Sequence, residues 1–317
     1  YPLHSNSQSK ALQKKIDEKT MFNKEGHSSF IYHLSDLHLG PKKKLKAVSN
    51  LLDSLDECDQ YAHSPHSKQV FITGDLMNSP NTKNMYQANS FMTMIRKRYK
   101  ADITFVLGNH DMIVKGLSIG GRQRTKVIAY LLGEKIKVIE KDKIILVKID
   151  SNAGGNLARG MITRRQLDQI DSELAGIENL EDYTIVVLLH HHVFKVSKSD
   201  FLKIRWREKS IFGSILDKSK ALVDANMFAT WLQQRHIKYV LHGHKHVPYF
   251  MNKNGTYYIS AGSATGGLKE SESHYYSYNV LRYDYMDKKM KTCLIFYDDN
   301  KKAERKRVEV YLMEEDK

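Results

Sequence analysis

Four short blocks of the sequence combine carboxylate, amide and imidazole side chains at spacings that suit metal binding. They are Asp36-Leu37-His38, Gly74-Asp75, Gly108-Asn109-His110-Asp111 and Gly243-His244-Lys245-His246. A run of three histidines, His190 to His192, lies between the third and fourth blocks. Together these residues supply enough oxygen and nitrogen ligands for two adjacent metal ions. The leading hypothesis is therefore a hydrolase that acts on a phosphate ester.

The spacing within the blocks indicates how the ligands would be shared. Asp36 and His38 are two residues apart, so on an extended segment both side chains lie on one face and reach one ion. Asp75 follows a glycine that allows a tight turn, and its two carboxylate oxygens can bridge two cations. Asn109 offers a neutral carbonyl oxygen. Ligands of these types, without thiolates, favour Mn, Fe, Zn or Ni over a structural zinc site built from cysteines.

Alternating strands and helices are predicted to position these blocks. Apolar segments typical of buried strands lie at residues 30–34, 70–73, 103–107, 143–150, 184–189 and 237–241. Helical spacing of apolar residues occurs at 46–61, 84–99, 163–174 and 222–234, with Thr163 as an expected N-cap. This alternation predicts a mainly parallel sheet covered by helices, in which ligands bind beyond the carboxyl ends of the strands. The metal-type residues fall at those ends.

The last part of the chain is richer in strands. Segments 257–260, 277–285, 291–297 and 308–312 are β-rich and suggest a second layer of sheet. Residues 1–29 are polar and are interpreted as an N-terminal extension. No linker sequence marks a second domain. Residues 30–317 are therefore expected to form one domain, with its C-terminal β-rich part starting at about 257.

Composition limits the class of protein and suggests partners. The chain has 317 residues, 41% of them apolar, which allows a full core. No apolar run approaches the roughly 20 residues of a membrane span. The net charge of +14 favours anionic partners: a phosphate substrate, nucleic acid or an anionic membrane. Basic clusters lie at Lys42–Lys44, Arg96–Arg98, Arg122–Lys126 and Lys301–Arg307. Because this charge is spread along the chain, the case for nucleic acid is weaker.

Cysteine usage favours a cytoplasmic protein. Cys58 and Cys293 give no disulfide framework, and free thiols fit a reducing compartment. The chain starts at Tyr1 without an initiator Met, so its natural N-terminus is expected to be missing. A removed targeting segment therefore stays open. The sequence leaves the oligomeric state open as well.

The set of blocks as a whole resembles the calcineurin-like binuclear metallophosphoesterases. The resemblance rests on Asp-x-His, Gly-Asp, Gly-Asn-His-Asp, a histidine at a strand end and Gly-His-x-His, and it covers roughly residues 30 to 265. It implies an α/β fold, a two-sheet β-sandwich flanked by helices. It also implies that one metal is held by Asp36, His38 and His246, and the other by Asn109, His244 and one histidine of the triple, with Asp75 as the bridge.

At two places in the sequence, more than one histidine could be the metal ligand. Family members often have His-His-Pro at the strand end, with the first histidine as ligand, and aligning Val193 with that proline selects His191. His190 is the alternative. His242 forms a second His-x-His pair with His244, but the family order favours His244 and His246 and leaves His242 as a neighbour.

The implied chemistry is hydrolysis by a hydroxide held between two ions about 3.5–4 Å apart. His110 follows a ligand without being one, and is expected to stabilise the phosphoryl group and to protonate the leaving oxygen. Asp111 is expected to orient the His110 imidazole. His110 and Asp111 are thus the candidate catalytic residues.

The class of phosphate ester is predicted from weaker signals. Gly160 through Leu167 and Ser260 through Ala264 resemble the cyclic-nucleotide and glycerophosphodiester phosphodiesterase branch, so phosphodiesters are the first choice. Residues 194–220 mix aromatic and basic side chains, and are interpreted as a lid over the substrate or a surface for nucleic acid or membrane. The alternatives are a nuclease, a hydrolase of lipid-linked pyrophosphates and a scaffold without activity. Every motif position keeps a competent ligand, which disfavours the scaffold.

Overall fold

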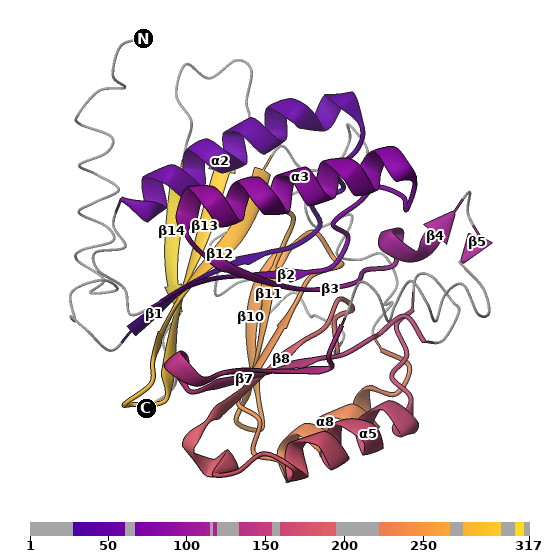
Figure 1. Cartoon of the computed structure of the whole chain (residues 1–317), viewed down its shortest axis with the longest axis vertical. Helices are drawn as coiled ribbons and strands as arrows, with labels where there is room; N and C mark the ends of the chain where they lie inside the picture. Colours follow the sequence, from indigo (N-terminus) through magenta and orange to yellow (C-terminus); the bar gives the residue numbers. More distant parts are fainter. Residues whose placement is uncertain are drawn as a thin grey trace.

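Two six-stranded sheets pack against each other, and helices cover the outer face of each sheet (Figure 1). The computed structural model describes residues 28–60, 67–114, 117–118, 133–153, 159–194, 222–266, 275–298 and 308–313. The fold class predicted from the sequence, α/β with a two-sheet sandwich flanked by helices, is confirmed. The expected N-terminal extension, apart from Ser28 and Ser29, lies outside the described residues.

The first sheet has the strand order β14-β13-β12-β1-β2-β3. Its parallel strands are β1 (Ser28–Leu34), β2 (Ser67–Thr73) and β3 (Asp102–Val106). Its antiparallel strands are β12 (Tyr275–Asp284), β13 (Lys289–Asp298) and β14 (Val308–Met313). Because β2 pairs with only one edge of β1, the other edge is open to β12. The last three strands therefore complete the first sheet, whereas the sequence suggested a layer of their own.

The second sheet has the order β10-β11-β9-β8-β7-β6. Its strands are β6 (Ile136–Ile139), β7 (Ile144–Lys148), β8 (Thr184–Leu188), β9 (Tyr239–His242), β10 (Pro248–Lys253) and β11 (Thr256–Ala261). The two edge strands, β6 and β10, were not predicted. Both mix polar and apolar residues, and β10 starts with Pro248, which an edge strand tolerates at its first position.

Four helices form the outer layers. α2 (Leu45–Asp59) and α3 (Thr82–Tyr99) cover the first sheet, and α5 (Arg164–Ala175) and α8 (Ala225–Gln234) cover the second (Figure 1). Thr163 caps α5 by accepting a hydrogen bond from the Gln166 backbone N–H at 3.2 Å, as predicted. α3 starts two residues earlier than expected because Asn81 caps it through the Asn84 N–H at 3.0 Å.

Short elements join the strands and helices near their ends. They are η1 (Lys42–Lys44), η2 (His110–Met112), η3 (Glu140–Asp142), η4 (Leu180–Asp182) and the paired strands β4 (Ile113–Val114) and β5 (Leu117–Ser118). Of these, η1 begins shortly after the first metal-type block, and η2 includes His110 and Asp111 of the third block.

Side-chain alternation along the strands builds three layers of core. In β1, Phe30 and Tyr32 face the cluster under α2 and α3, while Ile31 between them faces the second sheet. In β8, Val187 belongs to the cluster under α5 and α8, while Leu188 faces the first sheet. The strands are apolar on both faces because both faces are covered. This packing fixes how the strand ends of the two sheets lie relative to one another.

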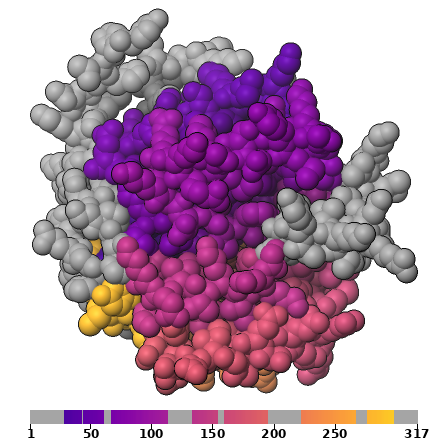
Figure 2. All heavy atoms as spheres, in the orientation of Figure 1, coloured from indigo at the N-terminus to yellow at the C-terminus, as the bar shows by residue number. Residues whose placement is uncertain are grey.

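The surface shows the same division into two halves. Figure 2 shows the indigo to purple residues, which come early in the chain, above the magenta to salmon residues that follow them. Among the described residues, no helix combines the length and the apolar character needed to cross a membrane.

Candidate metal centre

The metal-type blocks lie just beyond the carboxyl ends of strands from both sheets. Asp36 follows β1, Asp75 follows β2, Asn109 follows β3, His190 follows β8 and His244 follows β9. Backbone hydrogen bonds tie these ends together: the Asp36 N–H donates to Gly74 O at 3.0 Å, and the Gly243 N–H donates to His190 O at 3.1 Å. One site therefore takes ligands from both sheets.

The first ligand group consists of Asp36, His38, Asp75 and His246. One potential ligand atom from each lies within 4.8 Å of those from the other three. His246 Nε2 lies 3.1 Å from Asp36 Oδ1 and 3.2 Å from His38 Nε2. His38 Nε2 lies 3.7 Å from Asp75 Oδ2. The four side chains thus converge on one small volume.

The second ligand group consists of Asp75, Asn109, His190 and His244. His190 Nε2 lies 3.0 Å from Asn109 Oδ1 and 3.4 Å from Asp75 Oδ2. His244 Nδ1 lies 3.2 Å from both Asn109 Oδ1 and His190 Nε2. These atoms form a second convergent set, which includes an amide oxygen in place of the additional carboxylate.

Asp75 belongs to both groups through a single oxygen. Its Oδ2 faces His38 on one side and His190 on the other. Its Oδ1 accepts a hydrogen bond from the His110 backbone N–H at 2.8 Å. That bond fixes the carboxylate so that Oδ2 points between the two groups, which is the orientation that a bridging ligand needs.

The donor atoms fit metal ions better than they fit one another. Asp36 Oδ1 is buried, and it accepts no hydrogen bond of good geometry from the described residues, although His246 Nε2 is 3.1 Å away. Two pairs of imidazole nitrogens, one pair in each group, lie 3.2 Å apart. Oxygen and nitrogen lone pairs that face one volume in this way match Mn, Fe, Zn or Ni.

Burial and charge favour the metal-binding forms of most of these groups. Burial alone raises the pKa of Asp75, but the His190 and His38 rings outweigh it and hold the carboxyl pKa well below its usual range. Burial also raises the pKa of Asp36, but the neighbouring His246 and His190 rings together outweigh it and lower the carboxyl pKa. Burial lowers the pKa of His38 to about 3 and that of His244 well below its usual value. Both carboxylates are thus ionised and both rings neutral near pH 7.

His190 behaves differently from the other rings. Burial lowers its pKa, but the neighbouring Asp75 carboxylate outweighs this effect and raises the pKa to about 9. In the protein without bound cations, a proton on His190 therefore offsets the charge of Asp75. The position that holds this proton is the one that a cation would take.

The backbone at the ligand positions is strained. Asp36, His38, Asp75, His244 and His246 all have positive φ angles, from 42° to 74°. For residues other than glycine this costs of the order of 1–3 kcal/mol each. The i, i+2 side chains therefore converge through left-handed turns, and not through the extended segment expected from the sequence. Backbone strain concentrated at one place is typical of functional sites.

Two glycines allow the close approach of the ligand loops. A Cβ atom on Gly74, whose φ is +90°, would lie 2.5 Å from His190 Nδ1. A Cβ atom on Gly108 would lie 2.1 Å from Asp75 Oδ1. Glycine is therefore required at both positions for steric reasons, in addition to the turn that the sequence predicted at Gly74.

Of the three consecutive histidines, only His190 contacts Asp75 and Asn109 in the described structure. His191, the residue preferred from the sequence, instead places Nδ1 2.8 Å from Ser151 Oγ. His192 stacks on the His244 ring, with centroids 5.7 Å apart. The sequence choice relied on aligning Val193 with a proline. The geometry instead assigns the first ring after β8 to the second ligand group.

His110 lies at the edge of the centre. Its ring meets the His38 ring edge-on, with centroids 4.7 Å apart, and the residue is partly exposed. Its Nδ1 lies 3.2 Å from the Asn78 carbonyl oxygen. Because a carbonyl only accepts, Nδ1 carries the proton, and Nε2 is left for another partner.

Asp111 does not orient His110 as expected from the sequence. Its carboxylate accepts three backbone N–H bonds, from Met77 at 2.8 Å, Gly108 at 2.9 Å and Leu76 at 3.2 Å. Burial, together with the charge of Asp75, raises the pKa of Asp111 to about 7, against the opposing effect of the N–H groups. Asp111 thus joins the loops that carry Asp75 and Asn109.

The sequence did not reveal the side chain and the backbone group that hold Asp36. Ser35 Oγ donates to Asp36 Oδ2 at 2.6 Å, and the His244 N–H donates to the same oxygen at 3.0 Å. Oδ1 is thereby left to face the other ligands. A serine next to a metal-type aspartate was the available signal, but serine is too common at strand ends to stand out.

The two segments that resemble the phosphodiesterase branch hold the backbone of neighbouring strand ends and ligand loops. Gln166 clamps the end of β7 through the backbone of Asp150, accepting from its N–H at 2.7 Å and donating to its carbonyl at 3.0 Å. Ser263 Oγ donates to the Asp36 carbonyl at 3.0 Å. Of the proposed lid, only Phe194 is described, and it packs edge-on against Tyr258. Residues 195–220, like the basic clusters Arg122–Lys126 and Lys301–Arg307, lie outside the described residues.

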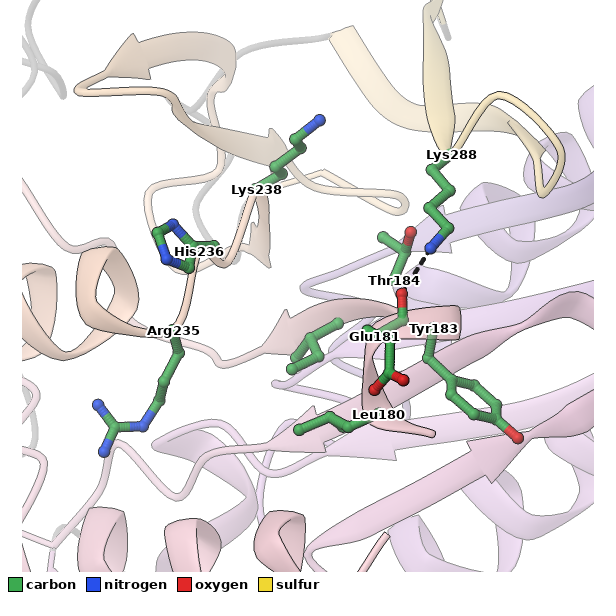
Figure 3. Close-up of a pocket in the computed structure, with 9 residues that line it drawn as sticks. Leu180, Glu181, Tyr183, Thr184, Arg235, His236, Lys238 and Lys288 are labelled. Carbon is green, nitrogen blue, oxygen red and sulfur yellow. Dashed lines mark hydrogen bonds between the residues drawn. The ribbon is translucent and has the colours of Figure 1, made fainter. Parts of the chain in front are cut away.

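A separate pocket lies at the opposite ends of β8 and β9, where these strands begin (Figure 3). It has a volume of about 480 Å³ and includes Thr184, Lys238 and Lys288. The Lys288 ammonium donates to the Glu181 carbonyl at 2.6 Å (Figure 3). The Arg235 guanidinium pairs with Asp171. This pocket is thus distinct from the metal centre, and at least two of its cations are held by the protein's own acceptors.

The role of Asp111 gives a direct prediction. Asp111→Asn keeps the shape but replaces one acceptor oxygen by an NH₂ group that faces backbone donors. We expect the free energy of unfolding, measured by urea denaturation, to fall by about 1–3 kcal/mol, and metal affinity to fall with it. Asp102→Asn, at the exposed start of β3, is the matched control. Unchanged stability and metal binding in Asp111→Asn would contradict this role.

Comparison with known proteins gives a family and several structures of similar topology. The calcineurin-like phosphoesterase (Metallophos) profile matches residues 31–248. No protein with a curated function matches the chain. A Vps29 single mutant from Entamoeba histolytica is 14% identical, with 90% of this chain and 99% of that chain covered and a TM-score of 0.41.

Two further structures have similar values. Phosphopantetheinyl hydrolase from Mycobacterium tuberculosis is 12% identical, with coverage of 75% and 91% and a TM-score of 0.41. GAP50, the anchor in the inner membrane complex of Plasmodium, is 11% identical, with coverage of 89% and 88% and a TM-score of 0.48. Identities and scores this low say nothing about activity. The profile, by contrast, spans well over half of the sequence and all seven positions of the two ligand groups, so the chain belongs to the calcineurin-like phosphoesterase family.

Proposed function

We propose that the protein is a two-metal hydrolase of phosphate esters, with phosphodiesters as its preferred substrates. The observation that supports this most directly is the position of Asp75 Oδ2 between the two ligand groups. A scaffold without activity would have no need for seven converging ligands, two of them buried carboxylates and five of them at strained backbone positions. The complete donor set therefore favours an enzyme.

Each ion has its own ligands in this proposal. Asp36, His38 and His246 would hold one ion, Asn109, His190 and His244 would hold the other, and Asp75, which lies between the two groups, would contribute to both. His190 takes the place that the sequence gave to His191, because its Nε2 is the triple's nitrogen beside Asp75 and Asn109. Ions bound at these positions would activate water and offset charge on the phosphoryl oxygens.

Groups around the ligands orient the Asp36 carboxylate and supply a proton to the substrate. Ser35 and the His244 N–H hold one oxygen of Asp36, so that the other faces the centre. His110 keeps its Nδ1 proton on the Asn78 carbonyl. When the ring is protonated, its Nε2–H can donate to a phosphoryl oxygen or to the leaving oxygen, so His110 is the proposed general acid.

The preference for phosphodiesters rests on sequence resemblance. The segments from Gly160 to Leu167 and from Ser260 to Ala264 support this preference. In the described structure, Gln166 and Ser263 of these segments bind backbone groups of Asp150 and Asp36. The test is a screen of the purified chain with added Mn²⁺ against cyclic nucleotides, aryl phosphodiesters, aryl phosphomonoesters and single-stranded DNA. Faster hydrolysis of monoesters would overturn the preference, and preferred cleavage of DNA would identify a nuclease.

The bridging role of Asp75 predicts a large loss of activity on substitution. Asp75→Ala removes the one oxygen shared by both groups, so we expect hydrolysis of an aryl phosphodiester to fall at least about 100-fold, with weaker binding of both ions. Asp102→Ala serves as control for removing an aspartate at the far end of the same sheet. Near-normal turnover in Asp75→Ala would rule out the proposed mechanism.

The choice between adjacent histidines predicts different metal contents. His190→Gln should leave one strongly bound ion, counted by mass spectrometry after gel filtration, because a ligand of the second group is lost. His191→Gln alters the contact with Ser151 and should retain both ions. The reverse pattern would restore His191 as the ligand.

The acid role of His110 predicts a dependence on the leaving group. His110→Ala should keep both ions yet lower kcat by about 10²–10⁴-fold for a poor leaving group such as an alkoxide. The loss should be smaller for a nitrophenolate, which departs without a proton. An equal loss for both leaving groups would argue against proton donation, and loss of an ion would make His110 a ligand.

A further inference from the structure

A short segment from Ser263 to Gly266, here called the clamp, lies against the backbone of the first metal-type block. Three consecutive carbonyls accept hydrogen bonds from it. Ser35 O accepts from the Ala264 N–H at 2.9 Å, Asp36 O from Ser263 Oγ at 3.0 Å and Leu37 O from Thr265 Oγ1 at 2.6 Å. These bonds engage the backbone on both sides of the Asp36 side chain.

The clamp holds the block in a conformation that it would not adopt alone. Asp36 and His38 have φ angles of 53° and 42°, which are unfavourable for residues with a Cβ. Such angles persist only where the surroundings fix them. The three carbonyl contacts provide that restraint, so the clamp determines where the Asp36 and His38 side chains point.

Lys44 holds the clamp from the other side. The residue is only 4% exposed, although it belongs to the basic cluster that the sequence suggested for substrate steering. Its ammonium donates to the Thr265 carbonyl at 3.0 Å and also to the Gly266 carbonyl. A buried lysine is stable only with such partners, and its burial keeps this ammonium away from substrate phosphates.

We propose that Lys44 is a positioning residue for the ion held by Asp36, His38 and His246. It acts through the clamp: Lys44 fixes Thr265 and Gly266, and the clamp fixes the strained backbone of Asp36 and His38. The inference rests on the proposed two-metal function and specifies how one of its two sites is kept in shape. We therefore expect loss of the Lys44 ammonium to weaken the binding of this ion and to leave the binding of the other ion unchanged.

Lys44→Met tests this, because methionine fills similar space without the ammonium. In a His190→Gln background, where the ion beside Asp36 remains, Mn²⁺ titration of the full chain should show about 10–100-fold weaker binding after Lys44→Met. In a His38→Gln background, where the other ion remains, the same change should not alter the affinity. A general loss of folding would weaken the binding of both ions alike. Equal losses of Mn²⁺ affinity in the two backgrounds would therefore refute the proposal.

A second readout does not depend on metal. Hydrogen exchange should be faster in Lys44→Met at the Asp36 and His38 amides, which donate to Gly74 O and Asp75 O. Lys42→Met, an exposed lysine of the same turn, is the matched control and should leave exchange and Mn²⁺ affinity unchanged. Thr265→Val, which removes the bond to Leu37 O, should reproduce the effect and carries the test if Lys44→Met does not fold.

The outcomes separate the two proposals. A wild-type chain that binds no Mn²⁺ would refute the two-metal function, and hydrogen exchange would still decide whether Lys44 holds the block. A wild-type chain that binds two ions, with Lys44→Met showing the same affinities and exchange rates, would refute the role of Lys44 alone.

Discussion

Two carboxylates, Asp36 and Asp75, are buried where the strand ends of both sheets meet. Ionised carboxylates are costly to bury unless positive charge is close to them. Within the described structure, the neighbours of their metal-facing oxygens are imidazole nitrogens, and the pKa of one of these rings, His190, is raised by Asp75. Much of the local architecture follows from this constraint, because one cation in each ligand group would satisfy both carboxylates at once.

Holding the donors in place requires the backbone to take unfavourable conformations. Five of the seven ligand positions have positive φ, and the loops that carry them come from two different sheets. Buried polar side chains hold these loops: Asp111 binds three N–H groups of the loops after β2 and β3, and Ser263 and Thr265 bind carbonyls of the loop after β1. The rigid cores of the two sheets supply the platform from which these contacts act.

The ligand types and the strand–helix rhythm could be predicted from the sequence because both are local patterns. Apolar strands followed by Asp, Asn or His place the donors at one end of a sheet, whatever the details of packing. The edge strands β6 and β10 could not be recognised, because half-polar edge strands lack a clear period. The choice between His190 and His191 depends on which ring turns toward Asp75 after β8, and this is decided by contacts between the two sheets.

The supporting residues were harder to predict for the same reason. Asp111 looked like a partner for its neighbour His110, yet its carboxylate binds N–H groups of a loop more than 30 residues away. Lys44 looked like part of a surface cluster, yet it is buried against Thr265, 221 residues away in the sequence. Long-range contacts of this kind leave no pattern in a single sequence.

We propose that Asp75 bridges two ions held by separate groups of side chains. Anomalous diffraction from crystals of the protein grown with Mn²⁺ tests it most directly. We expect two peaks, one beside Asp36, His38 and His246 and the other beside Asn109, His190 and His244, with Asp75 Oδ2 in contact with both. A single peak, or a second peak that His191 contacts and Asp75 does not, would contradict it.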